Sequence, residues 1–435
     1  MAQMHMANAF DPESVPEVPA RTAELLARRD AALSASYRLF YREPLEVVRA
    51  EGAWLYDSDG RPHLDMYNNV PAIGHAHPAV TEAVTRQLGR LNTHTRYLTE
   101  GILDYSEALL ETFPAALDQG TYACSGSEAV DLAVRMARFA TGREGIIISA
   151  HAYHGTTALA ASLSPSLGVN NPIAEAVATV DMRPGMDVET VAAEVRAAAA
   201  DLEARGHGVA AVIFDSIFSS DGVLPDPVGG LAAAADVARA FGGCVIADEV
   251  QPGFGRTGTM WGFSRHGVTP DLAVLGKPMG NGMPISAVVS RREISDAFGA
   301  SVRYFNTFGG NPVCIAAAQA VLDVITGSLL ARHAEQLGQV LADGLAVRAG
   351  RTALLGDVRA AGLFVGVDVR GSSERQPAET AAAIVNGLRQ RRVLISASGP
   401  GADVLKIRPP LVFDEAEAEV FFAALDDTLE DLEPS

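Results

Sequence analysis

The chain has 435 residues, of which 48% are apolar and 20% are charged, a composition typical of a globular protein with a large core. Lys and Arg together number 34, whereas Asp and Glu number 53, so the formal net charge is −19. This negative field argues against a general nucleic-acid binder, which needs a basic surface to meet the phosphate backbone. It leaves an anionic small substrate open, because a local cationic pocket acts at close range.

Three cysteines, Cys124, Cys244 and Cys314, are too few for a disulfide framework, and none has C-x-x-C spacing. We therefore expect buried thiols in a reducing compartment. The first twenty residues lack the basic start and the apolar stretch of a signal peptide, and no apolar run approaches membrane-spanning length. These features predict a cytoplasmic protein that contacts neither a membrane nor nucleic acid.

The first part of the chain, residues 1–74, begins with an irregular, Pro-containing stretch over 1–19. A helix is expected over 21–35. The segment 47–66 then reads as short strands that turn at Asp59-Gly60, because Asp-Gly is a common hairpin turn. We expect this N-terminal part to join the smaller of two lobes.

The middle part, residues 75–320, alternates short apolar strands such as GIIISAH and GCVIADEV with Ala-rich helices. Continuous apolar strands separated by helices predict an α/β fold, with a mostly parallel sheet covered on both faces. Such sheets bind ligands at the carboxyl ends of their strands. A long helix over 312–326 leads into residues 321–435, which read as a smaller α+β domain.

The segment Ser125-Gly126-Ser127-Glu128 follows a strand and opens a helix. Gly allows close approach of a ligand, and the free amides of a first helical turn favour an anion such as a phosphate. The same residues also fit an ordinary Ser N-cap with a Glu in the first turn. The segment alone leaves both interpretations open.

Two ionisable groups follow apolar strands at the expected ligand edge of the sheet. Asp248, followed by Glu249, ends the strand CVIADEV, where a buried carboxylate needs a partner. That partner is a protonated heteroaromatic nitrogen, or else the carboxylate has a structural role and caps a loop or pairs with an Arg such as Arg256. Lys277 follows the strand LAVLG and precedes a Gly-rich loop. A lysine in a cleft can form an imine, although an isolated loop lysine is usually solvated.

Two further patterns carry less weight. Residues 253–258 match G-x-G-x-x-G, but polar residues separate them from the preceding strand and a poor helix follows, so we do not expect nicotinamide binding. The pairs His75/His77 and His151/His154 lack an obvious third ligand, and we interpret them as turn and packing histidines. No metal site is expected.

Taken together, SGSEA, HAYHG, DEVQPGFGRTG, LGKPMGNGMP and NTFGGNP occur in an order that resembles the class III (subgroup II) aminotransferases. These are pyridoxal-phosphate (PLP) enzymes of fold type I, and the resemblance runs from about Leu39 to the C-terminal helix. It implies a large domain with a mostly parallel seven-stranded sheet plus a smaller α+β domain. It also implies that Lys277 is the Schiff-base lysine and proton shuttle, and that Asp248 keeps the pyridine nitrogen protonated.

The resemblance assigns cofactor contacts to five further positions. Gly126 and Ser127 would cradle the phosphate, Tyr153 would stack on the ring, and Gln251 would lie near the ring hydroxyl. Thr307 would reach the cofactor phosphate from the other subunit. That last role implies a homodimer with shared active sites, which could pair further into a tetramer.

The family contains aminotransferases and a smaller phospho-lyase branch. Aminotransferases that bind an α-carboxylate commonly use an Arg before the last Pro-Pro and a gate Glu, whereas the aligned positions here are Lys406 and Ser220. A Lys cannot give the two-pronged fork of an Arg. Several segments, including NNVPAIGHAHP and SGPGADVLKIRPP, instead resemble the ethanolamine-phosphate phospho-lyase branch of the family.

The resemblance therefore favours a PLP-dependent carbon–oxygen lyase that acts on a phosphorylated primary amine. O-phosphoethanolamine, giving acetaldehyde, ammonia and phosphate, is the favoured substrate. In this reaction Lys277 removes a proton from the amine-bearing carbon and the phosphate leaves. Lys406 and Arg408 are candidates to hold that phosphate, with Asn68 and Asn69 in the same pocket. The competing interpretation of Lys406 and Arg408 is a surface pair on an exposed strand.

Two alternatives remain. The first is an aminotransferase of the ω-amine or alanine–glyoxylate type. The second is a catalytically idle binding module, which the presence of both Lys277 and Asp248 disfavours.

Overall fold

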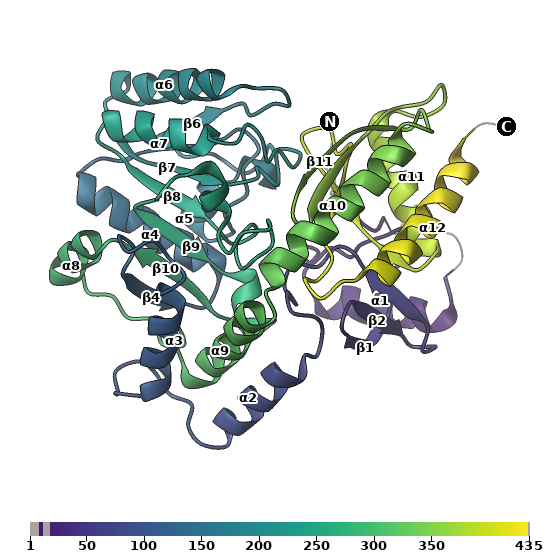
Figure 1. Cartoon of the computed structure of the whole chain (residues 1–435), viewed down its shortest axis with the longest axis horizontal. Coiled ribbons are helices and arrows are strands. Elements are labelled where there is room, and N and C mark those ends of the chain that lie inside the picture. The colour runs from purple at the N-terminus through teal and green to yellow at the C-terminus, as the bar shows by residue number, and fades with distance from the viewer. Residues whose placement is uncertain (1–7, 12–17, 434–435) are drawn as a thin grey trace.

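The computed structural model describes residues 8–11 and 18–433. The chain forms two lobes side by side (Figure 1), the larger built on a seven-stranded sheet and the smaller on two four-stranded sheets. Helices α9 (Pro312–Gly327) and α10 (Leu330–Ala349) run from the larger lobe into the smaller one, so the long helix expected over 312–326 is confirmed.

The large sheet has the strand order β4-β10-β9-β8-β7-β5-β6. Strand β10 is antiparallel to both of its neighbours and the other pairs are parallel. The predicted α/β class and mostly parallel seven-stranded sheet are therefore confirmed. The strands are β4 (Gln119–Ala123), β5 (Gly145–Ser149), β6 (Val177–Val180), β7 (Val209–Asp215), β8 (Cys244–Asp248), β9 (Leu272–Leu275) and β10 (Ser286–Ser290).

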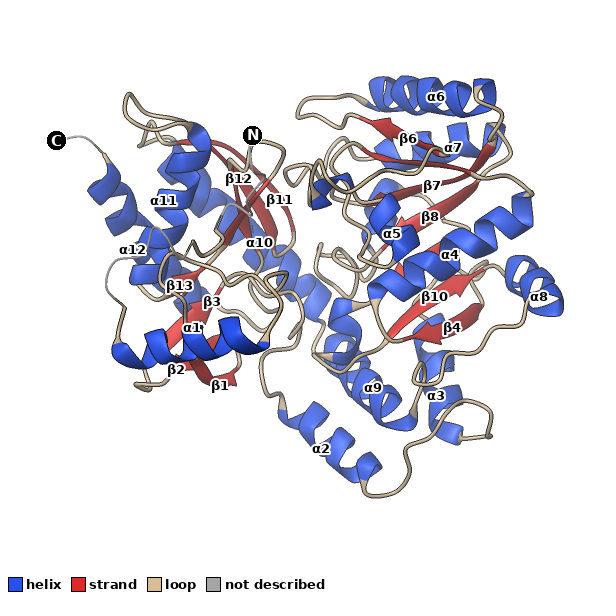
Figure 2. Cartoon of the chain, turned by 180° about the vertical axis from the view of Figure 1, so that it is seen from behind, coloured by secondary structure: helices blue, strands red, loops and turns tan. Residues whose placement is uncertain are grey.

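Helices cover both faces of this sheet because its strands are apolar on both sides. Ile146 and Ile148 of β5 pack with α4, whereas Ile147 packs into the opposite cluster with α6 and α7. Figure 2 shows α4 and α5 in front of the strands. The helices of this lobe are α2 (Pro78–Leu88), α3 (Glu100–Leu110), α4 (Gly126–Thr141), α5 (Ala158–Ser162), α6 (Val188–Ala204), α7 (Gly230–Ala240) and α8 (Arg292–Ser301).

The smaller lobe combines segments from both ends of the chain. Strand β13 (Val393–Leu394) pairs in parallel with β3 (Pro62–Asp65), which places the N-terminal strands β1 (Val47–Glu51) and β2 (Trp54–Asp57) in the same sheet. The β2–β3 hairpin turns at Asp59-Gly60 as expected, and Gly60 has a positive φ of 79°. The domain boundaries given above stay predictions.

The second small sheet has the order β11-β12-β15-β14 and carries the segment that contains Lys406. Its strands are β11 (Leu355–Ala361), β12 (Phe364–Val369), β14 (Ser396–Ser398) and β15 (Val404–Ile407), and the helices of this lobe are α1 (Ala20–Ala32), α11 (Pro377–Gln390) and α12 (Glu415–Leu432). Helix α1 is shorter than the predicted 21–35. Short 3-10 helices complete the chain: η1 (Pro165–Leu167), η2 (Gly262–His266) and η3 (Lys277–Gly280).

The G-x-G-x-x-G segment, residues 253–258, forms turns rather than a strand-to-helix connection. Gly255 and Gly258 have φ of +87° and +86°, and a Cβ at either position would lie 3.3 Å or less from Ala331 or Glu335 of α10. These glycines allow the loop to pack against the helix that leads into the smaller lobe. The segment therefore lacks the geometry of a dinucleotide site.

Within the described part of the chain, no single helix is long and apolar enough to cross a membrane. The pair α9 and α10 meets the length and composition test together, with a bend of 63° between the two helices. Helix α9 is largely buried inside the protein.

Candidate functional site

A cavity of about 210 Å³ lies where β7, β8 and β9 end and helix α4 begins. This is the edge at which parallel sheets bind ligands. Its walls come from five separate segments of the chain and contain five ionisable side chains: Tyr153, His154, Asp215, Asp248 and Lys277. The full lining is Gly126, Ser127, Tyr153, His154, Gly155, Asp215, Asp248, Val250, Gln251 and Lys277.

Lys277 is the first residue of η3, directly after β9, and its side chain lines this cavity. Its Nζ lies 5.9 Å from the centroid of the Tyr153 ring. Burial lowers the pKa of Lys277 to about 8, against the attraction of Asp248. A substantial fraction of the amine is therefore neutral near pH 8, the form required for attack on a carbonyl. The solvated-loop interpretation of this lysine does not fit its position.

Asp248 ends β8 and is buried, with each carboxylate oxygen bonded to protein. Its Oδ1 accepts from the Val250 amide at 3.1 Å, and its Oδ2 lies 2.6 Å from His154 Nδ1. The structural partner suggested from the sequence, Arg256, is wrong. Arg256 instead donates to Asn69 Oδ1 at 2.9 Å and to the backbone carbonyls of Leu363 and Pro409.

His154 is the functional candidate that the sequence analysis missed, because it was interpreted as a packing histidine. The available signal was its place in HAYHG, directly after Tyr153, in a chain with a buried Asp that needs a partner. Neighbouring Glu249 points away from the cavity and accepts the amides of Gly262 and Phe263 at 2.7 and 2.9 Å. Burial raises the pKa of Glu249 to about 8.

The start of α4 combines both interpretations of SGSE. Ser125 and Glu128 form a capping box, which fixes the first turn of the helix. Gly126 and Ser127 then face the cavity with first-turn amides that have no partner within the helix. A Cβ on Gly126 would lie 3.2 Å from Val250, so a side chain here would crowd the cavity wall.

The loop after HAYH closes over the same turn. Thr156 donates its amide to Ser127 Oγ at 3.0 Å, and a Cβ on Gly155 would lie 2.4 Å from that oxygen. The small residues Ser127 and Gly155 leave a concave, amide-lined surface at the positive end of helix α4, which has sixteen residues. This end of the cavity fits a phosphate group.

Lys406 and Arg408 are both buried, so the exposed-strand interpretation is wrong. Lys406 Nζ donates to the Ser219 carbonyl at 2.9 Å. Arg408 donates from Nε to the Tyr67 carbonyl at 3.0 Å and from Nη1 to Gln251 Oε1. Neither cation forms an ion pair with an Asp or Glu of residues 8–11 or 18–433. Burial, followed by repulsion from Arg408, lowers the pKa of Lys406 well below its ordinary value.

The other predicted contacts lie in three different settings. Gln251 borders the cavity, but its amide is bonded at both ends, to Arg408 and to Ser219 Oγ at 2.6 Å. Asn69 is buried and bonded to the Gln251 carbonyl at 2.9 Å and to Arg256, while Asn68 Oδ1 accepts from the Val70 amide at 3.0 Å. Thr307 is exposed and lies outside this cavity.

The cavity thus brings together an amine of lowered pKa, a buried carboxylate and an amide-lined cup. This donor set fits PLP, whose aldehyde, pyridine nitrogen and phosphate need these three groups. Lys277, Asp248 and the Gly126–Ser127 turn would hold it, and Tyr153 lies beside the space. All of these residues line the same cavity.

Comparison with known proteins identifies the family. The model of the aminotransferase class-III family matches residues 40–429. An alanine–glyoxylate aminotransferase 2-like protein of Drosophila melanogaster is 39% identical, over 92% of this chain and 85% of its own length. Ethanolamine-phosphate phospho-lyase homolog 1 of Caenorhabditis elegans is 36% identical over 93% of both chains.

Two solved structures extend the comparison. A phospholyase from Arthrobacter in complex with phosphoethanolamine has a TM-score of 0.90 and 44% identity, covering 94% of this chain and 100% of its own. An amine transaminase from an uncultivated Pseudomonas species, solved in a PLP-bound form, has a TM-score of 0.82 and 26% identity over 90% and 96% of the two chains. The chain therefore belongs to the class III aminotransferase family of fold type I, and its cofactor is PLP.

Proposed function

We propose that this protein is a phospho-lyase that eliminates phosphate from a phosphorylated primary amine, with O-phosphoethanolamine as the substrate. The observation that carries the proposal is the pair of buried cations, Lys406 and Arg408, which have no acidic partner among the described residues. A buried charge without a counter-ion is costly, so a site that retains two of them is adapted to an anionic ligand.

The cations belong to the same electrostatic site as the proposed catalytic lysine. Burial lowers the pKa of Lys277 and that of Lys406, and the positive charge of Arg408 lowers both further. An anion bound by Lys406 and Arg408 would therefore lie within reach of the Lys277 field. Both relatives named for a phospho-lyase activity support the same substrate class.

PLP, when bound, supplies an electron-withdrawing ring that stabilises negative charge on the amine-bearing carbon. Lys277 would hold the cofactor and, once released by the substrate amine, take a proton from that carbon. Asp248, supported by His154, would hold a proton on the pyridine nitrogen. Lys406 and Arg408 would stabilise the phosphate as its carbon–oxygen bond breaks. With one water consumed, phosphoethanolamine yields acetaldehyde, ammonia and inorganic phosphate, and all atoms balance.

An aminotransferase activity is the second candidate, and the similarity to the Drosophila aminotransferase-like protein favours it. That reaction needs a pocket that binds an amino acid and a keto acid in turn. The position aligned with the usual carboxylate-binding Arg is Lys406, and a lysine cannot bind a carboxylate in the bidentate geometry of an arginine. This difference favours the one-substrate lyase.

The test is to mix PLP-loaded protein with phosphoethanolamine, without a keto acid, and to follow phosphate and acetaldehyde together. Equimolar release over many turnovers is the expected result. Lys277→Ala is the control, and it should release neither product and lack the absorbance band of lysine-bound PLP. The wild type could instead release neither product and convert its cofactor to the amine form with an ω-amine or amino acid. That result would identify the protein as an aminotransferase and overturn the lyase proposal.

We further propose a homodimer in which Thr307 serves the cavity of the other subunit. Thr307 is exposed beside Phe308, which is 69% exposed, and Leu98 on a neighbouring segment is 98% exposed. Large apolar side chains gathered at one surface are typical of a protein–protein interface. A cytoplasmic location stays a prediction.

A further inference from the structure

Ser219, which no sequence motif singled out, is completely buried in the loop after β7 and joins several groups of the site. Its hydroxyl donates to Asp215 Oδ2 at 2.6 Å and accepts from Gln251 Nε2 at 2.6 Å. Its amide donates to the same Asp215 oxygen at 2.9 Å. Its carbonyl accepts from Lys406 Nζ at 2.9 Å and from Ser398 Oγ at 3.0 Å. All of its polar atoms are therefore in use.

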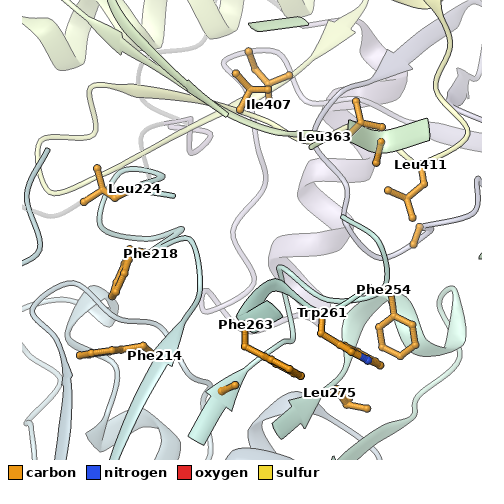
Figure 3. Close-up of a cluster of buried hydrophobic side chains, with 14 of the residues drawn as sticks. Phe214, Phe218, Leu224, Phe254, Trp261, Phe263, Leu275, Leu363, Ile407 and Leu411 are labelled. Atoms are coloured by element: carbon orange, nitrogen blue, oxygen red, sulfur yellow. The ribbon is translucent and has the colours of Figure 1, made fainter. Parts of the chain in front are cut away.

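The two buried cations reach Ser219 from the other lobe. Lys406 lies in β15, and Arg408 is the first residue after this strand. The buried residue Ile407 lies between the two cations. Figure 3 shows Ile407 with the apolar side chains of the smaller lobe, across from Phe218 of the Ser219 loop. Because side chains alternate along a strand, Lys406 and Arg408 point to the face opposite Ile407. Lys406 meets Ser219 directly and Arg408 meets it through Gln251.

The chemistry of these groups fixes the direction of each hydrogen bond. An ionised Asp215 can only accept, so the single hydroxyl proton of Ser219 goes to Asp215. The Ser219 oxygen must then accept from Gln251, which turns the NH₂ end of that amide toward Ser219. The carbonyl end of Gln251 consequently faces Arg408, a group that can only donate. Without the Ser219 hydroxyl, the NH₂ of Gln251 loses its acceptor, and the guanidinium alone remains to orient the amide.

The same network leaves donors free for a ligand. Arg408 has five N–H groups and uses one on Tyr67 and one on Gln251, while Lys406 uses one of its three on Ser219. The acceptors bonded directly to both side chains are neutral. Asp215 attracts both positive charges but forms an ion pair with neither. The network orients the two cations.

We propose that Ser219 is a positioning residue that fixes Lys406 and Arg408 as a preformed phosphate site, and thereby makes the protein selective for phosphorylated amines. This inference rests on the proposed function and names the residue that sets its substrate class. Ser219 does not touch the substrate. It acts through Gln251 on Arg408 and through its carbonyl on Lys406.

The test is a calorimetric titration of PLP-loaded protein with inorganic phosphate. Ser219→Ala keeps the carbonyl but removes both hydroxyl bonds, and we expect the Kd for phosphate to rise about tenfold, as for loss of a hydrogen bond to a charged group. The matched control is Ser106→Ala, which also removes a hydroxyl with two bonds, to the Ile102 carbonyl and the Tyr122 hydroxyl, away from the cavity. It should leave the Kd unchanged.

A double-mutant cycle separates positioning from a structural role. Gln251→Met should weaken phosphate binding by itself, and Ser219→Ala added to it should produce no further loss, because the hydroxyl acts on Arg408 through Gln251. In steady-state assays the KM for phosphoethanolamine should rise by the same factor as the Kd, with kcat changed less than threefold. Ser219→Cys, which preserves volume, replaces the alanine variant if that variant does not fold.

Failure of this inference is distinguishable from failure of the proposed function. If the wild type binds phosphate but releases none from phosphoethanolamine, the lyase proposal fails and the titrations still decide the role of Ser219. An unchanged Kd in Ser219→Ala, additive losses in the cycle, or no phosphate binding by the wild type would each overturn it.

Discussion

His154 Nδ1 lies 2.6 Å from Asp248 Oδ2, and both side chains are buried at the base of the cavity. The carboxylate therefore has a ring partner on one oxygen and the Val250 amide on the other. A buried carboxylate needs such hydrogen bonds, since burial of a polar group without them is costly. Because Asp248 is the group that would hold a proton on the PLP pyridine nitrogen, His154 becomes a candidate positioning residue.

We expect His154→Phe to lower kcat/KM at least about tenfold, since it leaves Asp248 buried without its charge-assisted partner. His154→Asn, whose side-chain NH₂ can take the place of Nδ1, should recover a large part of the loss. The measurement is kcat/KM against pH, together with absorbance titration of bound PLP. Equal activity in the Phe variant and the wild type would remove His154 from the site.

Replacing Lys406 should change stability and ligand binding in opposite directions. Lys406→Met removes a buried cation that has no acidic partner in the described chain, so the ligand-free protein should gain about 1 kcal/mol or more in stability. Phosphate at one hundred times its Kd should add about 2.7 kcal/mol to the wild type and much less to the variant. Thermal midpoints with and without phosphate measure both effects.

The control for this experiment is Arg351→Met, which removes an exposed cation from the same lobe. It should change neither the midpoint nor the phosphate effect by a measurable amount. A Lys406→Met variant less stable than the wild type, yet fully responsive to phosphate, would contradict the assignment of Lys406 as an anion-binding group.

Asp221 should make stability depend on pH. Burial raises its pKa from 3.8 to about 7, despite bonds from Ser149 Oγ at 2.7 Å and the His151 amide at 3.1 Å. At a pH between these two pKa values, the unfolded chain binds fewer protons than the native protein. The free energy of unfolding therefore falls as pH rises from about 4 to 7. Each pKa unit corresponds to about 1.4 kcal/mol, so the free energy of unfolding falls by at most about 4 kcal/mol over this range.

Asp221→Asn keeps the size and cannot ionise. Its carbonyl can still accept from the His151 amide, while its NH₂ can donate to Ser149 Oγ, which reverses that bond. The variant should therefore match the wild type near pH 4 and become progressively more stable than it up to pH 8. Urea midpoints measured across this range test the expectation. A stability difference that does not vary with pH would show that Asp221 ionises freely in the native protein.

The shared-site proposal for Thr307 predicts complementation between two inactive variants. Lys277→Ala lacks the amine, and Thr307→Glu places a carboxylate where the proposal puts a cofactor phosphate. In a mixed dimer, one site receives intact Lys277 from one subunit and intact Thr307 from the other. Co-expressed variants should thus regain about one quarter of wild-type activity, because half of the dimers are mixed and each has one intact site. No recovery in mixed dimers would place Thr307 in the cavity of its own subunit.

Much of the fold was predictable because its signals are local. Apolar strands alternating with Ala-rich helices predict a sheet covered on both faces. The antiparallel direction of β10 was not predictable, because a fully buried strand has the same apolar pattern in either direction. The burial of Lys406 could not be decided from the sequence for a related reason, since a short strand with charged residues also fits an exposed edge.

Short segments with a characteristic order predicted the family, the cofactor chemistry, and the strand-end positions of Lys277, Asp248 and the Gly126–Ser127 turn. The hydrogen-bond partners of the site residues became known only from the three-dimensional packing. His154 meets Asp248 across 94 positions, and Lys406 meets Ser219 across 187. Such pairs leave no local pattern, because a hydrogen bond between distant segments depends on where the sheet and the two lobes bring them, and not on the residues that flank them in the chain.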